Sequence, residues 1–235
     1  KRVPYIIALR GSDVPGYNAR LKILDKFVFK FLSRIIWKNA RAVTALSNNL
    51  KNLAQRTFDR INIQVIYNGV DADKFKPVIN ENSNLTILFV GRLIKRKGIK
   101  YLLRAFKEVH DEYKSCELTI VGEGPKRKYL ENLCKQMNIE SGVNFLGGIK
   151  YKDIANVYKK ASIVVLPSLE ESLGNVTLEA MASGLPLITT NTGAAELIDK
   201  NGFIVNKRDY KQIKKAIIEY IKNPELRRKH GQQSR

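Results

Sequence analysis

Short apolar runs alternate with longer amphipathic segments along the chain from Leu85 onward. Runs rich in β-branched residues predict buried strands at 86–91, 116–122, 143–147, 162–168 and 185–190. Apolar residues at helical spacing predict helices at 98–110, 126–138, 152–160, 174–183 and about 209–222. Strands that alternate with helices and are apolar on both faces are typical of an α/β fold with a doubly wound parallel sheet.

The first 77 residues predict part of a second α/β unit. The segments "PYIIALRGSD" and "ARAVTALS" flank a long helical pattern, and "INIQVIYNGVD" predicts a further strand. The polar stretch "PVINENSNL" at 77–85 is typical of a hinge between domains. Because this first part has too few strands for a complete domain and the chain opens without Met, we expect a fragment of a longer protein.

The composition narrows the classes of protein. Hydrophobic residues make up 44% of the 235 residues, which is typical of a globular protein with a full core. No run approaches the roughly 18 consecutive apolar residues that indicate a membrane span. Cys116 and Cys134 are too few for a disulfide framework, so we expect a reducing cytosol. His110 and His230 lie too far apart in sequence to indicate a zinc site or a catalytic triad.

The formal charge of +20, from 42 basic and 22 acidic residues, favours an anionic partner. A phosphorylated ligand, an anionic membrane surface and a nucleic acid would each fit such a charge. A lysine-rich, AT-biased genome is the alternative explanation, and it carries no functional meaning. A nucleic-acid partner is not expected, because no helix-turn-helix, RNA-binding sheet motif or zinc finger is recognisable.

Two glycine-rich loops follow the first two strands of the sheet. The loop "GRLIKRKG" puts Arg92 at the end of a strand and Lys97 at the start of a helix. Ligands of such sheets bind at the carboxyl ends of the strands, and two cations beside helix-terminal amides can bind a diphosphate. The loop "VGEGP" predicts a tight turn under a ligand, although it lacks the full dinucleotide-binding fingerprint.

The stretch "EESLGNVTLEAMASGLP" carries two carboxylates, Glu171 before a helix that begins near Asn175 and Glu179 inside that helix. A glycosidase pair would need a groove rich in aromatic residues, and the strand-end loops have few. A carboxylate that accepts hydrogen bonds from two vicinal hydroxyls fits better, as in the ribose contacts of dinucleotide-binding folds. The implied ligand is a nucleoside diphosphate that carries a sugar. The alternative is that both acids are merely helix-end charges.

The motifs "GRLIKRKG", "VGEGP", "FLG" and "PSLEESLGNVTLEAMASGLP", in this order, closely resemble the donor domain of retaining glycosyltransferases of family 4. Glu171 and Glu179 match the E-x7-E motif of that family, and "VTALSNNLK…VIYNGVDADKF" resembles the end of its acceptor domain. The resemblance covers nearly all of the chain. It implies a GT-B type fold, with a partial acceptor-side domain at 1–77, a Rossmann-like donor domain at 78–222 and the start of a C-terminal crossover segment at 223–235. Several strands and a glycine-rich loop of the acceptor domain have no counterpart here.

The implied function is the transfer of a hexosyl group from a nucleotide-diphosphate sugar, with retention of configuration, in the assembly of a bacterial surface polysaccharide or glycolipid. The resemblance implies that Arg92 and Lys97 bind the donor diphosphate and neutralise the leaving group. It also implies that Glu171 contacts the transferred sugar and that Glu179 binds the ribose hydroxyls. Further substrate-binding groups are expected at Gly124, Leu146, Asn175, Val176 and Asp13. A fragment that binds a nucleotide sugar without catalysis is the alternative.

The family usually works without a metal, so no metal or other cofactor is expected, and the nucleotide sugar is a substrate. The stretch "DAD" at 71–73 superficially matches a metal-binding D-x-D motif. Because it stands in "NGVDADKF", where Asp and Gly favour turns, we predict a turn.

The expected acceptor is a saccharide or a lipid-linked saccharide. The basic and apolar segment "RLKILDKFVFKFLSRIIWKNAR" at 20–41 has helical spacing, and such a helix can lie in an anionic membrane interface. The alternative is a helix that buries its apolar face within the domain. We expect a cytoplasmic location, with peripheral association with the inner membrane face as a hypothesis.

Overall fold

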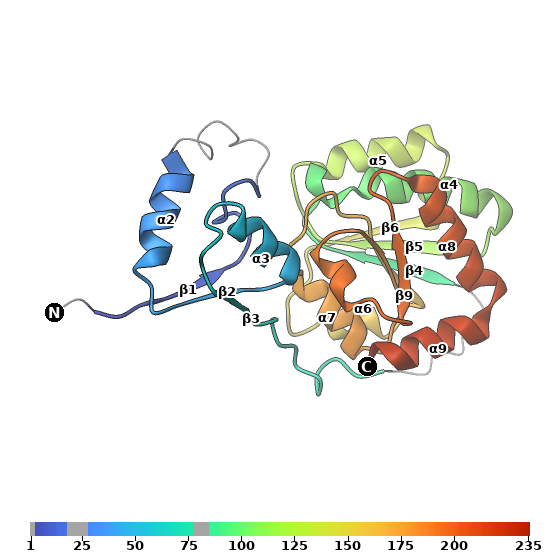
Figure 1. The fold of residues 1–235 in the computed structure, drawn as a ribbon. Coiled ribbons are helices and arrows are strands. Elements are labelled where there is room, and N and C mark those ends of the chain that lie inside the picture. The colour runs from blue at the N-terminus through green and yellow to red at the C-terminus, as the bar shows by residue number, and fades with distance from the viewer. Residues whose placement is uncertain (1–2, 18–27, 78–84) are drawn as a thin grey trace. The chain divides into compact units, whose positions relative to one another are not determined.

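The computed structural model describes residues 3–17, 28–77 and 85–235. The chain divides into two compact units, Lys1–Asn68 with Glu170–Gly174, and Gly69–Leu169 with Asn175–Arg235 (Figure 1). The expected division at residues 77 and 222 stays a prediction, and residues 78–84 of the expected hinge lie outside the described residues.

The described part of the second unit contains a six-stranded sheet with the strand order β6-β5-β4-β7-β8-β9. Every neighbouring pair is parallel. The strands are β4 (Thr86–Val90), β5 (Glu117–Val121), β6 (Val143–Gly147), β7 (Ile163–Leu166), β8 (Leu187–Thr190) and β9 (Gly202–Val205). The chain runs outward from β4 to β6 and returns to pair β7 with the free side of β4. This order confirms the doubly wound parallel sheet.

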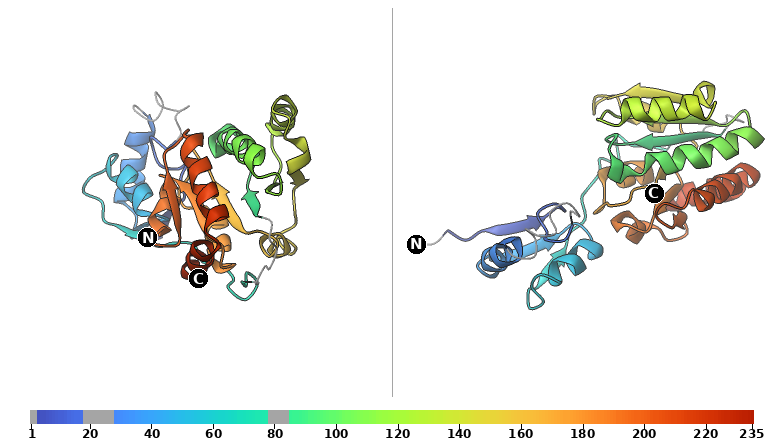
Figure 2. Two further views of the ribbon diagram at one scale, coloured as in Figure 1. Left: turned by 90° about the vertical axis from the view of Figure 1, so that its right-hand side faces the viewer. Right: turned by 90° about the horizontal axis from the view of Figure 1, so that it is seen from above.

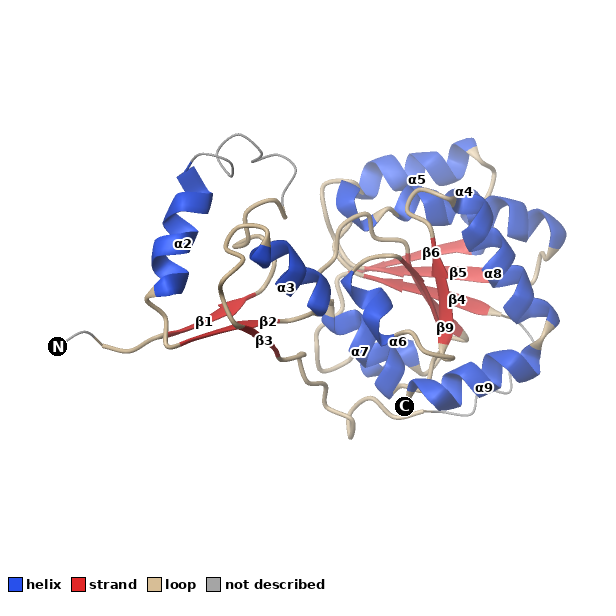
Figure 3. Cartoon of the chain, viewed as in Figure 1, coloured by secondary structure: helices blue, strands red, loops and turns tan. Residues whose placement is uncertain are grey.

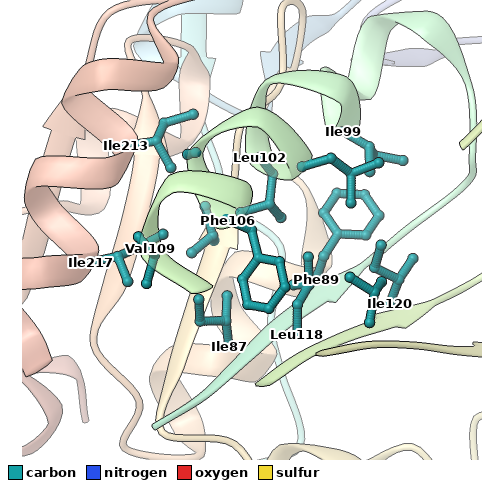
Figure 4. Close-up of a cluster of buried hydrophobic side chains, with 14 of the residues drawn as sticks. Ile87, Phe89, Ile99, Leu102, Phe106, Val109, Leu118, Ile120, Ile213 and Ile217 are labelled. Carbon is teal, nitrogen blue, oxygen red and sulfur yellow. The ribbon is translucent and has the colours of Figure 1, made fainter. Parts of the chain in front are cut away.

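Helices cover both faces of this sheet, as the further views in Figure 2 and the colours in Figure 3 show. The first face carries α4 (Ile99–Glu112), α5 (Arg127–Gln136) and α8 (Tyr210–Lys222). Leu102, Phe106 and Val109 recur at helical spacing on α4, and they pack against Ile87 and Leu118 of the sheet (Figure 4). The second face carries α6 (Ala155–Tyr158) and α7 (Asn175–Ala182) over a smaller apolar cluster.

The first unit has a three-stranded parallel sheet in the order β1-β2-β3 among its described residues. Its strands are β1 (Ile6–Leu9), β2 (Ala42–Ala45) and β3 (Ile63–Val65), and its helices are α2 (Lys30–Lys38) and α3 (Asn48–Gln55). Ser47 begins α3, because its side chain accepts a hydrogen bond from the amide of Leu50 at 3.1 Å. Trp37 of α2 and Leu50 of α3 are buried and pack into the apolar core of this unit.

The predicted strands of both units are present, although several are shorter than predicted. Three elements were not predicted by the apolar pattern: α3, the edge strand β9 and α9 (Pro224–Ser234). Short 3-10 turns complete the described elements at η3 (Lys95–Lys97), η4 (Glu140–Gly142) and η5 (Gly193–Leu197). In the part of the chain that the structure describes, no helix combines the length and the apolar character needed to cross a lipid bilayer.

Candidate functional site

The candidate site lies where the order of the sheet reverses, between β4 and β7. Loops diverge at such a switch point and leave room for a ligand outside the carboxyl ends of the strands. A backbone hydrogen bond joins the loop after β4 to the loop after β7, because the amide of Leu169 donates to the carbonyl oxygen of Arg96 at 2.6 Å. The loop that carries the predicted cations Arg92 and Lys97 is thus hydrogen-bonded to the segment that follows β7.

Arg92 stands in the loop that follows β4, and hydrogen bonds tie this loop to the one that follows β5. The amide of Leu93 donates to the carbonyl oxygen of Glu123 at 2.9 Å, and the amide of Lys126 donates to that of Leu93 at 3.0 Å. A Cβ on Gly124 would lie 2.6 Å from the carbonyl oxygen of Leu93, so glycine is required for this close packing. The Arg92 side chain is exposed at the edge of the connected loops.

Lys97 ends the 3-10 turn η3 in the same loop. Gly98, which follows it, has a φ of 68°, and a Cβ there would lie 1.9 Å from the carbonyl oxygen of Pro167 at the end of β7. The side chain of Lys97 runs back toward β4, because its Cε lies 3.7 Å from the position of a Cβ on Gly91. Lys97 therefore lies beside the residue that directly precedes Arg92.

Glu179 lies in the second turn of α7, whose N-terminus follows the loop after β7. The carboxyl oxygen Oε2 accepts a hydrogen bond of 2.8 Å from the hydroxyl of Tyr158 on α6. The side chain of Glu179 is only 9% exposed, and Tyr158 is fully buried. Burial, together with the adjacent Glu179, raises the pKa of Tyr158 well above its usual value. Tyr158 was not among the predicted site residues, because a contact between two helices leaves no signal in the local sequence.

Asn175 and Val176 form the first turn of α7, with Asn175 exposed and Val176 partly buried against the apolar cluster below. Backbone amides in the first turn of a helix have no partner within that helix. The predicted role of these two amides depends on this general property of helix ends.

Leu146 is half-exposed on β6 and borders a cavity of about 140 Å³. The cavity lies on the second face of the sheet, and its other lining residues are Thr86, Leu88, Thr119, Asn156, Val157, Lys160 and Ala161. The side chain of Leu146 therefore faces the cavity under α6. The predicted contact of the Leu146 backbone with a nucleotide stays a prediction.

Asp13 and Glu171 belong to the first unit. Both carboxyl oxygens of Asp13 accept hydrogen bonds from backbone amides, at 3.0 Å from Arg10 and at 2.6 Å from Gly11, and so close the turn after β1. The carboxyl carbon of Glu171 lies 3.3 Å from the position of a Cβ on Gly174, whose φ is 77°. Arg92, Lys97 and Glu179 all belong to the second unit, and the roles of these five residues in binding and catalysis stay predictions.

The stretch 71–73 forms the predicted turn. The carboxylate of Asp71 accepts hydrogen bonds of 3.0 Å from the amides of Asp73 and Lys74. Within residues 3–17, 28–77 and 85–235, no group of three or more His, Cys, Asp or Glu side chains is arranged to hold a metal ion.

Comparison with known families gives one match that spans the second unit. The family model described as "Glycosyl transferases group 1" matches residues 70–235. An uncharacterized glycosyltransferase of Methanocaldococcus jannaschii is 31% identical over 237 residues, which cover 98% of this chain and 62% of the relative. The capsular polysaccharide biosynthesis glycosyltransferase CapM of Staphylococcus aureus is 29% identical over 252 residues, which cover 100% of this chain and 64% of CapM.

Comparison with solved structures gives the fold. Anabaena HepE, crystallised in complex with UDP and glucose, aligns with a TM-score of 0.84 at 22% identity over 98% of this chain and 65% of its own. The fold is that of GT-B glycosyltransferases. The chain spans less than two thirds of the length of the curated relatives it matches.

Proposed function

We propose that this chain, which belongs to the family of glycosyl transferases group 1, transfers a sugar from a nucleoside-diphosphate donor to an acceptor with retention of configuration. One observation carries the proposal. The buried carboxylate of Glu179 is held in the second turn of α7, in the same unit as Arg92 and Lys97. The loop that carries the two cations follows β4, and α7 follows β7, and these two strands flank the switch point. Such an arrangement fits a ligand with hydroxyls at one end and phosphates at the other.

In this proposal the donor diphosphate binds to Arg92, Lys97 and the amides of Asn175 and Val176. Glu179 accepts hydrogen bonds from the two hydroxyls of the ribose. Gly124 and the backbone of Leu146 border the nucleotide, while Glu171 contacts the transferred sugar and Asp13 is a further substrate-binding group. Anabaena HepE, which shares the fold of this chain, was crystallised with UDP and glucose, and this complex supports a nucleotide-sugar donor.

In this proposal the sugar is transferred by a front-face displacement. The bond between the sugar carbon C1 and the phosphate oxygen breaks, and the acceptor oxygen bonds to C1 on the same face. The leaving phosphate takes the acceptor proton, and the cations of Arg92 and Lys97 stabilise the charge that develops on it. No metal is required in this scheme. The role of CapM in capsular polysaccharide biosynthesis supports an acceptor in surface polysaccharide or glycolipid assembly.

Substitution of Glu179 by Ala tests the ribose contact. We expect calorimetry with a nucleoside diphosphate to show donor binding weakened by about tenfold or more, because two hydrogen bonds to a charged group are lost. Unchanged affinity would contradict the role of Glu179.

A thermal-shift screen of the chain against UDP-, GDP- and ADP-sugars tests the donor class, since a bound ligand raises the melting temperature. Turnover assays with the sugar that binds then distinguish an enzyme from a binding fragment. Binding without turnover on any saccharide or lipid-linked acceptor would favour the non-catalytic alternative.

We further propose that α2 lies on the cytoplasmic face of an anionic membrane. The helix buries Trp37 but exposes Phe31, Leu32, Ile35 and Ile36, and Lys30 and Lys38 add positive charge. Residues 20–27 of the segment that led to this hypothesis lie outside the described residues.

Co-sedimentation with vesicles of anionic phospholipid at low salt checks the membrane proposal. We expect the wild-type chain to bind, and the double substitution Phe31→Ser and Ile35→Ser to reduce binding several-fold by removing exposed apolar area. Absence of wild-type binding at low salt would remove the idea.

A further inference from the structure

Tyr158 is a fully buried residue on α6 whose hydroxyl meets the candidate ribose-binding carboxylate. Its hydroxyl oxygen donates to Oε2 of Glu179 at 2.8 Å. The two helices lie side by side on the second face of the sheet (Figure 1). Because burial raises the pKa of Tyr158, the hydroxyl keeps its proton, and so remains a donor, throughout the physiological range of pH.

The ring of Tyr158 is itself held in place. The ring of Phe75 is fully buried and meets it edge-on, with the ring centroids 5.5 Å apart and the ring planes at 83°. The guanidinium of Arg235 donates to the carbonyl oxygens of Phe75, at 3.1 Å, and of Ala182, at 2.8 Å. The hydroxyl of Tyr158 therefore points from a fixed ring toward a fixed helix.

This contact restricts the carboxylate of Glu179. A hydrogen bond to one oxygen of a carboxylate fixes the rotation of the group and the direction of the second oxygen. Among the described residues no hydrogen-bond donor reaches Oε1 of Glu179. The fixed carboxylate therefore keeps one oxygen for the phenol and one for a ligand.

We propose that Tyr158 is a positioning residue: its hydroxyl holds the Glu179 carboxylate in the orientation that accepts the ribose hydroxyls of the donor. This inference rests on the proposed function, because it assigns Tyr158 an effect on ligand binding through Glu179. Tyr158 itself does not touch the ligand in this arrangement. Removal of its hydroxyl loosens the carboxylate and adds the cost of ordering it again when the ligand binds.

The test compares Tyr158→Phe with the matched variant Tyr220→Phe. Tyr220 is also fully buried in the second unit, and its hydroxyl bonds to a different partner, Nδ1 of His230, at 2.8 Å. Binding of UDP, GDP and ADP is measured by calorimetry, together with the 2′-deoxy counterpart of the nucleotide that binds. We expect Tyr158→Phe to bind the ribonucleotide about tenfold more weakly, and Tyr220→Phe to bind it as the wild type does.

The preference for the ribonucleotide over its 2′-deoxy counterpart gives a readout that a loss of stability alone does not change. We expect this ratio to fall in Tyr158→Phe, because the contact that reads the hydroxyl is misplaced. Partial unfolding would weaken the binding of both nucleotides equally and leave this ratio at its wild-type value. A wild-type ratio in Tyr158→Phe would therefore overturn the inference.

A double-mutant cycle with Glu179→Gln completes the test. If Tyr158 acts through the carboxylate, Tyr158→Phe has little further effect on binding once Glu179 is Gln. Independent, additive losses would overturn the inference. Wild-type affinity in Tyr158→Phe, with weak binding in Glu179→Gln, would overturn it and leave the proposed function intact. No binding of any of the three nucleotides by the wild type, or wild-type binding in Glu179→Gln, would overturn both.

Discussion

At the scale of single residues, His230 shows how burial changes the chemistry of a side chain outside the site. It lies against the rings of Phe203 and Tyr220, with centroid distances of 5.5 Å and 5.7 Å. The Tyr220 hydroxyl oxygen and Nδ1 of His230 lie 2.8 Å apart and share a hydrogen bond. Burial and the neighbouring Lys229 lower the pKa of His230 below its usual 6.5.

This shift predicts a pH dependence of stability. Below pH 6.5 the unfolded chain takes up a proton at His230 before the folded chain does. The stability that the neutral side chain of His230 contributes is therefore fully present above the pKa of His230 in the unfolded chain. This stability is lost as the pH falls through the lower pKa of His230 in the folded chain. We expect the melting temperature of the wild type to drop more between about pH 7 and pH 5 than that of His230→Gln, which has no imidazole to protonate. Equal slopes in differential scanning calorimetry would contradict this assignment.

Sequence reasoning at this scale depends on local signals. Arg92, Lys97 and Glu179 could be proposed as site residues because their residue types stand in a loop and a helix that follow predicted strands, and their roles stay predictions. The partnership of Tyr158 with Glu179 could not, because the two residues are brought together only by the packing of α6 on the sheet.

At the scale of elements, the predictable strands are those with continuous apolar runs. Every residue of β7 and β8 is buried, and β7 is apolar throughout. The hydroxyls of Thr189 and Thr190, which end β8, donate to the carbonyl oxygens of Leu166 and Ser168. In contrast, β9 is an edge strand in which Val205 alone is fully buried. The helix α9 buries Gly231 and Ser234 and has no apolar stripe, so its signals are the cap Asn223 and Pro224 at the first position.

The docking of α9 depends on close backbone contact. A Cβ on Gly231 would lie 2.4 Å from the carbonyl oxygen of Gly184, at the end of α7. Near the end of α9, the hydroxyl of Ser234 donates to the carbonyl oxygen of Leu185 at 2.9 Å. The absence of a side chain at one position therefore sets the distance between these two segments.

Substitution of Gly231 by Ala tests this contact. We expect the added methyl group to push α9 from its site and to lower the free energy of unfolding by about 2 kcal/mol. Amide hydrogen exchange should increase in α9 and remain slow in α4. The control is Gln232→Ala at the neighbouring exposed position, and equal stability of the two variants would show that α9 adapts without cost.

At the scale of the whole molecule, the formal charge of +20 is the dominant electrostatic property. A chain with this charge attracts anions over the distance that salt leaves unscreened, about 10 Å at 0.1 M. This field adds to the local cations Arg92 and Lys97, so a diphosphate gains more from it than an uncharged nucleoside does.

Salt therefore discriminates between the two parts of the proposed ligand. We expect the affinity for the nucleoside diphosphate that binds to fall several-fold between about 0.05 M and 0.5 M sodium chloride. The affinity for the corresponding nucleoside, measured by the same calorimetry, should change little. Equal salt dependence of both ligands would show that the charge of the chain does not act on the phosphates.

The order of the sheet also has a consequence for how the second unit is made. The central strand β4 pairs with β5 soon after it along the chain, but its other partner, β7, follows only after β6 and α6. A ribosome releases the chain from its N-terminus, so one edge of a strand that is apolar from Ile87 to Val90 stays unpaired while the intervening segment is synthesised. Protection of that edge during translation is thus a requirement that this topology places on the cell.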